Sequence, residues 1–332
     1  MNPQIPSTLA ALLASGKGIL AADESVSTIG KRFQALNIAS TEETRCAYRE
    51  MLITTPGLSE FISGVIMFNE TFRQRTSAGV RMPEALAKLG IVPGIKVDIG
   101  TAPLARFAGE KVTLGLDELR ERLTEYHALG ARFTKWRAVI AIGDSIPSDT
   151  CIKANAHALA RFAALSQEAD LVPIVEPELL MDGTHTVARC EEVSRTTLNA
   201  VFAALLEHRV TLEQMLLKPA MILPGAACTE QANVAVVTEA TLRCFKRVVP
   251  AAVPGIVFLS GGQSDEGATE NLNAICGRGA APWTLSFSFG RALQSPAMKA
   301  WSGMDKHVAA AQKALHYRAK CNSLATRGLL DP

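Results

Sequence analysis

One lysine of the sequence lies inside an apolar stretch, where its charge would be costly. In MLLKPAMILPG, residues 215–225, Lys218 is flanked by Met, Leu and Ile residues, and the run predicts a buried strand. An ionised ammonium in such a place costs several kcal/mol unless it is paired, so Lys218 needs a partner or stays neutral. A neutral amine is a nucleophile, and its attack on a ketone leads to an iminium ion, the Schiff base.

Other charged residues stand near the carboxyl ends of further apolar runs. Side chains alternate along a strand, so residues two positions apart share a face. Such pairs are Lys96 with Asp98, Lys135 with Arg137, and Glu176 with Glu178, while Asp23 and Ser260 close two more runs. If the strands are parallel, these groups meet at one end of the sheet, where neighbouring cations would lower the pKa of a lysine toward neutrality.

This set of groups suits the cleavage of a carbon–carbon bond through a lysine Schiff base. The iminium charge accepts the electrons that are released when the neighbouring bond breaks. One carboxylate must move protons as the imine forms, and a second must take a hydroxyl proton as the bond cleaves. We assign these roles to Glu176 and Asp23. Lys218 is the preferred nucleophile because its flanks are the most apolar, and Lys135 is the alternative.

Two glycine-containing turns indicate a phosphate site. GIVFLSGGQ and SFSFGRALQ coincide with the seventh and eighth apolar runs and the turns that follow them. Glycines at strand-to-helix turns leave backbone N–H groups free to bind an anion, and barrel enzymes often bind phosphate after strands seven and eight. Arg291 adds a guanidinium that can chelate phosphate oxygens.

The elements that must position these groups alternate between strand and helix. Amphipathic stretches of helical length separate most of the apolar runs, which are residues 18–23, 64–68, 94–98, 132–139, 171–177, 216–223, 255–262 and 284–290. Eight such units predict an α/β fold, a (β/α)8 TIM barrel that forms a single domain over residues 1–332 with additional N-terminal and C-terminal helices. An open doubly wound sheet is the alternative, but GGQSDEG lacks the spacing of its glycine fingerprint.

Two helix starts can be placed from capping residues. Ser7 or Thr8 is expected to cap a first helix. Ser40 and Glu43 have the spacing of a capping box, which predicts a helix between the first two strands.

Charge and composition exclude several classes of partner. The formal net charge is +2, which gives no support to binding of nucleic acid. No segment approaches the roughly 20 apolar residues of a membrane span, and LAALLA at residues 9–14 lacks a basic leader. We therefore expect a protein without a targeting segment or membrane contact.

Metal-assisted cleavage is the competing chemistry, and it would use clustered histidines. The histidines are scattered, and none ends a predicted strand; they stand at positions 127, 157, 185, 208, 307 and 316. The seven cysteines are odd in number and form no CxxC pair, which indicates reduced thiols, a cytoplasmic location and no structural zinc. We predict no metal and no cofactor.

Several motifs, in the same order, resemble the class I, Schiff-base-forming fructose-bisphosphate aldolases. They are GKGILAADES, GIKVD, FTKWR, PIVEPE, LLKPAMIL, FLSGGQS, SFSFGRALQ and YRAKCNSLATRG, and together they cover nearly the whole chain, from residue 16 to residue 328. The resemblance implies reversible cleavage of fructose 1,6-bisphosphate to dihydroxyacetone phosphate and glyceraldehyde 3-phosphate, in glycolysis and gluconeogenesis. It also implies a homo-oligomer, by default a tetramer.

The resemblance also implies roles for individual residues. Lys218 would form the imine, Glu176 would shuttle protons, and Asp23 would act on the C4 hydroxyl. Further residues of the same pocket are Lys135, Arg137, Lys96 and Glu178. The ketose phosphate would lie against Ser260, Gly261, Gly262, Ser288, Gly290 and Arg291. The other end of the substrate would meet Ser25, Thr28 and Arg32.

Some positions depart from the family pattern. Val26, Ser27 and Thr28 stand where Thr-Gly-Ser is common, Ile99 replaces a lysine of animal members, and Phe289 replaces a tyrosine. The sequence ends at Pro332 without the tyrosine-ended tail of animal members. Two alternatives therefore stay open, a Schiff-base aldolase for fructose 1-phosphate or another phosphorylated ketose, and a non-catalytic barrel that serves as a binding scaffold.

Overall fold

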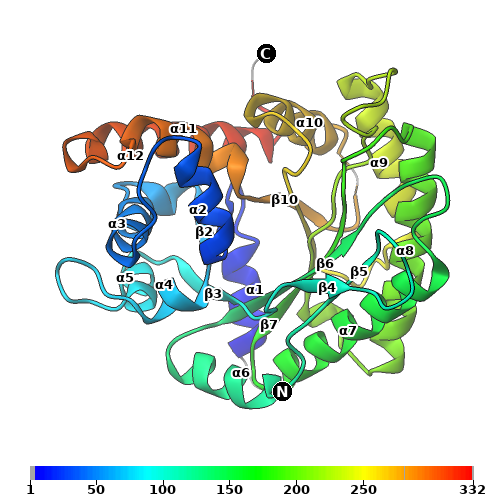
Figure 1. The fold of residues 1–332 in the computed structure, drawn as a ribbon, viewed down its shortest axis with the longest axis horizontal. Helices are drawn as coiled ribbons and strands as arrows, with labels where there is room; N and C mark the ends of the chain where they lie inside the picture. Colours follow the sequence, from blue (N-terminus) through cyan, green and yellow to red (C-terminus); the bar gives the residue numbers. More distant parts are fainter. Residues whose placement is uncertain (1–3, 280, 331–332) are drawn as a thin grey trace.

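Eight parallel strands form a closed barrel at the centre of the protein (Figure 1). The computed structural model describes residues 4–279 and 281–330, so Pro332 lies outside the described residues. The barrel order is β1-β10-β9-β8-β7-β6-β3-β2. Its strands are β1 Gly18–Ala22, β2 Ile62–Met67, β3 Val92–Lys96, β6 Phe133–Ile140, β7 Val172–Leu179, β8 Leu216–Leu217, β9 Gly255–Phe258 and β10 Thr284–Phe289. Each predicted run overlaps one of these strands, which confirms the (β/α)8 barrel and excludes the open sheet.

Helices follow the strands and surround the barrel, with additional helices at the two ends of the chain, as predicted. The helices are α1 Gln4–Leu12, α2 Val26–Gln34, α3 Glu42–Ile53, α4 Asn69–Arg73, α5 Met82–Lys88, α6 Leu119–Ala128, α7 Asp149–Glu168, α8 Val187–Glu207, α9 Val234–Val248, α10 Asp265–Gly277, α11 Arg291–Trp301 and α12 Val308–Ala325. Short 3-10 turns are η1 Leu58–Glu60, η2 Leu212–Gln214 and η3 Asp305–His307.

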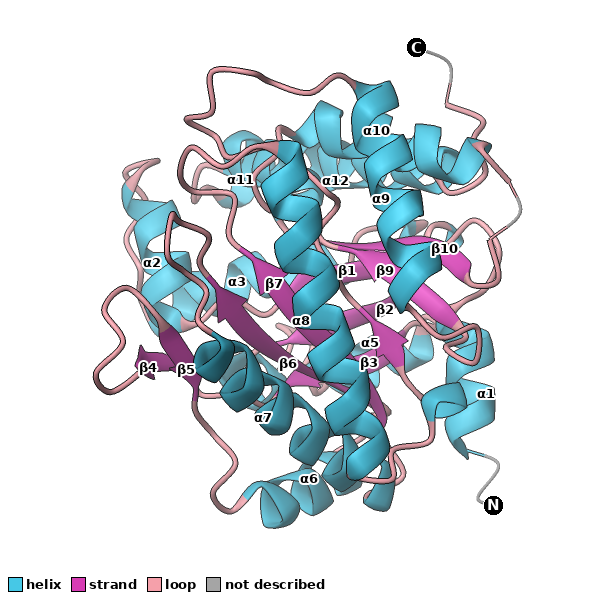
Figure 2. Cartoon of the chain, turned by 90° about the vertical axis from the view of Figure 1, so that its right-hand side faces the viewer, coloured by secondary structure: helices cyan, strands magenta, loops and turns pink. Residues whose placement is uncertain are grey.

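A small hairpin interrupts the alternation after β3. Its strands, β4 (Thr101–Pro103) and β5 (Lys111–Thr113), pair antiparallel and stand outside the barrel. Asn155 of α7 fixes the hairpin, because its side chain donates to the Lys111 carbonyl at 2.9 Å and accepts from the Thr113 N–H at 3.3 Å. The hairpin and α1 lie on opposite sides of the barrel (Figure 2).

Helix α1 closes the barrel at the amino ends of the strands. Ile5, Leu9 and Leu12 pack against apolar side chains of the barrel interior, among them Phe133. The strands leave room for large rings by placing glycine opposite them: a methyl group at Gly18 would lie 2.5 Å from the Phe287 ring. This end is thus filled by side chains, and the carboxyl ends of the strands are left to carry polar groups.

Strand β8 is shorter than predicted. The apolar run suggests a strand over residues 216–223, but only Leu216 and Leu217 form a ladder with both neighbouring strands. The cause is Pro219, which has no N–H to donate to the ladder. Lys218 is the last residue that still donates to the neighbouring strand, with its N–H 2.8 Å from the Val175 carbonyl oxygen.

Both predicted capping positions are wrong. Helix α1 already includes Ser7, whose hydroxyl donates to the Gln4 carbonyl at 2.9 Å instead of capping the helix. Helix α3 begins one residue later than the capping box requires, because Thr41 is the N-cap and accepts from the Thr44 N–H at 3.2 Å. Neighbouring Ser and Thr residues offer equivalent oxygens, so the sequence does not distinguish them.

We propose that residues 1–332 form one domain, which the packing of α1 and α12 on the same barrel supports. Within residues 4–279 and 281–330, none of the helices combines the length and apolarity that crossing a membrane requires.

Candidate active site

Lys218 is buried at the carboxyl end of the barrel, next to a carboxylate. Its Nζ lies 3.0 Å from Glu176 Oε1, and the side chains of both residues are 4% exposed. Glu176 comes from β7, the strand that Lys218 still contacts through its backbone. The apolar run of the sequence therefore does bury this amine, and Glu176 of the neighbouring strand is its ion-pair partner.

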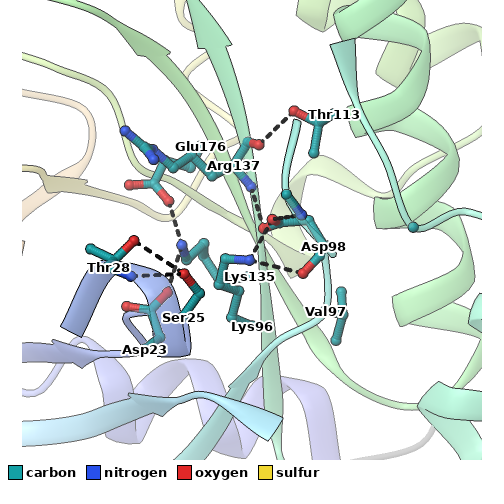
Figure 3. A network of polar contacts seen from close by, with 12 residues as sticks. Asp23, Ser25, Thr28, Lys96, Val97, Asp98, Thr113, Lys135, Arg137 and Glu176 are labelled. Atoms are coloured by element: carbon teal, nitrogen blue, oxygen red, sulfur yellow. Dashed lines mark hydrogen bonds and ion pairs between the residues drawn. The ribbon is translucent and has the colours of Figure 1, made fainter. Parts of the chain in front are cut away.

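Two further charged groups complete a cluster with Lys218 and Glu176. Lys135 Nζ of β6 lies 2.7 Å from Asp23 Oδ2 and 3.0 Å from Glu176 Oε2. Figure 3 shows Lys135 between Asp23, which directly follows β1, and Glu176. Four strands thus bring together the four residues predicted to be catalytic, and one carboxylate, Glu176, contacts both lysines.

The carboxylates of this cluster are held in their ionised form. Burial raises the pKa of Asp23, but the charges of Lys135 and Lys218 outweigh burial and hold that pKa well below its usual range. Burial likewise raises the pKa of Glu176, and Lys135, Lys218 and Arg137 lower it below the usual value. Both groups are therefore available as proton acceptors in the free protein.

The same charges make Lys135 a poor nucleophile. Burial lowers the pKa of Lys135, but Asp23, Glu176 and Asp98 raise it above the usual lysine value. The expectation that neighbouring cations bring a lysine toward neutrality is thus wrong for Lys135, because carboxylates and not cations are its nearest neighbours. Lys135 stays an ammonium, so Lys218 remains the predicted nucleophile of the pair.

The remaining predicted pocket residues form two ion pairs beside this cluster. Lys96 Nζ lies 2.5 Å from Asp98 Oδ1, and the Arg137 guanidinium pairs with Glu178. Burial lowers the pKa of Arg137, but Glu178 raises it above the usual value. Asp98 also accepts from the Arg137 N–H at 3.2 Å, so it joins β3 to β6 (Figure 3).

The predicted phosphate residues lie on the turns after β9 and β10. A methyl group at Gly261 would lie 2.9 Å from Glu178 Oε1 and 3.9 Å from Arg291 Nη2, so this turn adjoins both side chains. Gly262 has φ +77°, a conformation that favours glycine. The other residues of the set are buried Ser260, buried Ser288, Gly290 at the start of α11, and exposed Arg291.

The residues predicted for the other end of the substrate, Ser25, Thr28 and Arg32, follow Asp23 closely in the sequence. Ser25 is the N-cap of α2, and its hydroxyl is 3.1 Å from that of Thr28 (Figure 3). Arg32 Nη1 lies 2.5 Å from Glu24 Oε1. The structure thus places these residues beside the cluster, on one loop and helix. Which ligand they contact stays a prediction.

Sequence reasoning missed three groups that hold this site. Glu24 pairs with Arg32, Gln294 donates to Glu24 at 2.8 Å, and Thr113 donates to the Arg137 carbonyl at 2.8 Å. Of these three residues, only Glu24 could have been found from the sequence, because it directly follows the predicted catalytic residue Asp23. The other two come from segments whose approach depends on the closed barrel.

Backbone hydrogen bonds join the loops after β7 and β8 above the cluster. The N–H groups of Gly225, Ala226 and Ala227 donate to the carbonyls of His185, Met181 and Gly183 at 2.8, 2.7 and 2.9 Å. The His185 ring is buried, and neither of its nitrogens has a hydrogen-bond partner among the described residues. Such a ring is stable only when it is neutral.

We expect the protein to lose stability in mild acid because of His185. Burial, and then the charge of Arg189, lower the pKa of this ring below its usual value of 6.5. The unfolded chain therefore binds the proton more tightly, so the free energy of unfolding should be unaffected above about pH 6.5 and should fall as the pH decreases below it. Urea unfolding at pH 8 and pH 5.5 measures this difference. The His185→Gln variant should show a smaller difference in the free energy of unfolding between the two pH values. An unchanged difference would contradict the role of His185. His316→Gln serves as the control.

The sequence predicts no metal site, because the histidines are scattered. Across residues 4–279 and 281–330, no group of three or more His, Cys, Asp and Glu side chains is arranged to hold a metal ion. The seven cysteines form no disulfide with one another in the part of the chain that is described.

The closed barrel and its lysine–carboxylate cluster define a (β/α)8-barrel enzyme with the groups of a carbon–carbon lyase. The chain belongs to the glycolytic class I fructose-bisphosphate aldolase family. The model of this family, described as "Fructose-bisphosphate aldolase class-I", matches residues 5–332. This confirms the family and the enzyme class that the motifs indicate.

Relatives of similar length match over nearly the whole chain. A probable class 1 fructose-bisphosphate aldolase of Xanthomonas campestris pv. campestris is 56% identical over 98% of both chains. The cytosolic fructose-bisphosphate aldolase 4 of Arabidopsis thaliana is 52% identical over 94% of this chain and 80% of its own. The fructose-bisphosphate aldolase of Plasmodium falciparum, solved with TRAP and a small-molecule inhibitor, has a TM-score of 0.97 and 47% identity over 99% of this chain and 95% of its own.

Proposed function

We propose that the protein catalyses the reversible cleavage of fructose 1,6-bisphosphate to dihydroxyacetone phosphate and glyceraldehyde 3-phosphate through a Schiff base at Lys218. The observation that carries the proposal is the contact of Glu176 with both lysines, Lys218 Nζ and Lys135 Nζ, at 3.0 Å each. Lys135 also pairs with Asp23 at 2.7 Å, which keeps it an ammonium that stabilises charge, so Lys218 is the amine proposed to react.

Formation of the imine uses Lys218 and Glu176. Glu176 takes a proton from the lysine, and the neutral amine attacks the C2 carbonyl of the ketose. Glu176 then returns a proton to the C2 hydroxyl of the carbinolamine, which leaves as water and gives the iminium ion. The 3.0 Å separation of Lys218 Nζ and Glu176 Oε1 suits both transfers.

Cleavage uses Asp23. Its ionised carboxylate takes the proton of the C4 hydroxyl, the C3–C4 bond breaks, and the electron pair moves into the iminium to give an enamine. Glyceraldehyde 3-phosphate leaves first; protonation of the enamine at C3 and hydrolysis of the imine then release dihydroxyacetone phosphate. Lys135, 2.7 Å from Asp23, keeps this carboxylate ionised before the reaction.

Substrate phosphates would be bound at the two sides of the cluster. The glycine turns after β9 and β10, with Ser260, Ser288 and Arg291, would take the ketose phosphate near Glu178. Ser25, Thr28 and Arg32 would take the phosphate at the other end of the sugar. Lys96 and Arg137 would bind hydroxyl groups of the sugar, between its two phosphates.

A steady-state assay tests this function. Purified protein should release triose phosphate from fructose 1,6-bisphosphate with a higher kcat/KM than from fructose 1-phosphate, because Arg32 adds a charge-assisted contact to the second phosphate. A chelator should leave the rate unchanged. Equal kcat/KM values would favour the monophosphate alternative, loss of activity with chelator would reject the metal-free mechanism, and no cleavage of either sugar would favour the scaffold alternative.

We also propose a cytoplasmic homotetramer. The names of two plant relatives, from Arabidopsis thaliana and Pisum sativum, which call them cytosolic and cytoplasmic, support the first part. The resemblance to a family whose members are usually tetramers supports the second. The mass of the native protein in solution, measured by light scattering, checks the tetramer.

A further inference from the structure

Glu24 stands next to the proposed base Asp23 but belongs to a different network. Its Oε1 lies 2.5 Å from Arg32 Nη1 and 2.8 Å from Gln294 Nε2, and its Oε2 lies 2.6 Å from Arg49 Nη1. The Glu24 side chain is 6% exposed. Three partners on three helices thus fix one buried carboxylate.

This network is anchored on α3 and α11. Gln294 of α11 also donates to the Ala21 carbonyl at 2.6 Å and accepts from the Tyr48 hydroxyl of α3 at 3.0 Å. Helices α2, α3 and α11 lie on the same side of the barrel (Figure 1). The position of the Glu24 carboxylate is therefore set by the fold before any ligand arrives.

The two arginines of the network differ in exposure. Arg49 is 3% exposed, whereas the Arg32 side chain is 27% exposed. Burial raises the pKa of Glu24, but Arg49 and Arg32 lower it below the usual value, so the carboxylate is ionised. Arg32 uses only Nη1 for this contact, and its Nε and Nη2 have no partner within residues 4–279 and 281–330. They are free to bind an anion.

We propose that Glu24 is a positioning residue for substrate specificity, which holds Arg32 where its free N–H groups bind the phosphate remote from the imine. The inference rests on the proposed function, in which Arg32 meets that phosphate. Immobilising a free arginine side chain when a ligand binds costs free energy and reduces affinity. Glu24 holds Arg32 in place before the ligand binds, so this cost is smaller. Without the carboxylate, the like charges of Arg49 and Arg32 repel, and the more exposed Arg32 turns toward solvent.

Kinetics with two substrates that differ only in that phosphate test the role. Glu24→Gln should raise KM for fructose 1,6-bisphosphate about tenfold, with kcat changed by less than about twofold, because it removes a charge-assisted contact. KM for fructose 1-phosphate should stay within about twofold. Arg32→Met should have the same effect, and the double variant should be no worse than Arg32→Met alone, because Glu24 acts only through Arg32.

A matched control and a rescue variant separate positioning from folding. Glu70→Gln breaks another Arg–Glu pair, with Arg45 at 2.5 Å, and should not change either KM. If Glu24→Gln fails to fold because Arg49 loses its counter-ion, Glu24→Gln with Arg49→Met removes the unpaired charge and is measured instead.

The outcomes are distinct. Equal effects of Glu24→Gln on both substrates, a lower KM for the bisphosphate, or additive effects in the double variant would overturn the positioning role. Wild-type protein that cleaves neither sugar would overturn the proposed function, and this inference with it.

Discussion

Replacing Lys218 with methionine should abolish cleavage, lowering kcat by a factor on the order of 10⁴ or more. Methionine keeps the length and the apolar part of the side chain, so the buried site keeps its packing. Glu176 would still pair with Lys135, and Lys135 cannot take over as nucleophile because Asp23 and Glu176 keep it protonated. Release of triose phosphate from fructose 1,6-bisphosphate measures the loss.

Chemical trapping tests the identity of the nucleophile directly. Borohydride added with dihydroxyacetone phosphate should fix the ligand to the peptide that contains Lys218, and the Lys218→Met variant should remain unlabelled. Lys17→Met is a suitable control, because Lys17 precedes β1 and its Nζ donates to the Ser59 carbonyl at 2.7 Å, outside the cluster. Label on Lys135, or no label on the wild-type protein, would refute the assignment.

The sequence predicted the barrel well because the strands are buried on both faces. Such strands read as continuous apolar runs, and each of the eight runs overlaps one of the eight barrel strands. The length of β8 was predicted wrongly. The run after Met215 stays buried through Leu223, yet Pro219 ends the ladder, and burial and pairing are separate properties of a chain.

Strand periodicity also predicted which charged residues approach one another. Lys135 with Arg137, and Glu176 with Glu178, do lie at one end of the barrel. The sequence could not give the pairing itself, because the register of β6 and β7 and the closure of the barrel decide that Lys135 lies between Asp23 and Glu176. For this reason the expectation that neighbouring cations lower the pKa of a lysine in this cluster does not hold for Lys135, whose pKa is raised.

The network around Glu24 shows the limit of motif reading. Glu24 is adjacent to Asp23 in sequence, but its partners Arg49 and Gln294 come from α3 and α11. No periodicity in the sequence links a strand end to two helices that are remote along the chain. Only the packed structure shows that the residue next to the base contacts a different set of groups.

Replacing Asp23 with asparagine should separate formation of the imine from cleavage of the bond. The amide has nearly the same shape but cannot take the C4 hydroxyl proton, so kcat should fall by roughly 10²- to 10⁴-fold. Lys218 and Glu176 are untouched and stay 3.0 Å apart, so borohydride trapping with dihydroxyacetone phosphate should persist. Asp149→Asn, at an exposed ion pair with Lys153, should leave both properties unchanged. If Asp23→Asn abolishes trapping as well, Asp23 is needed before the bond breaks, and its role as the base for cleavage is wrong.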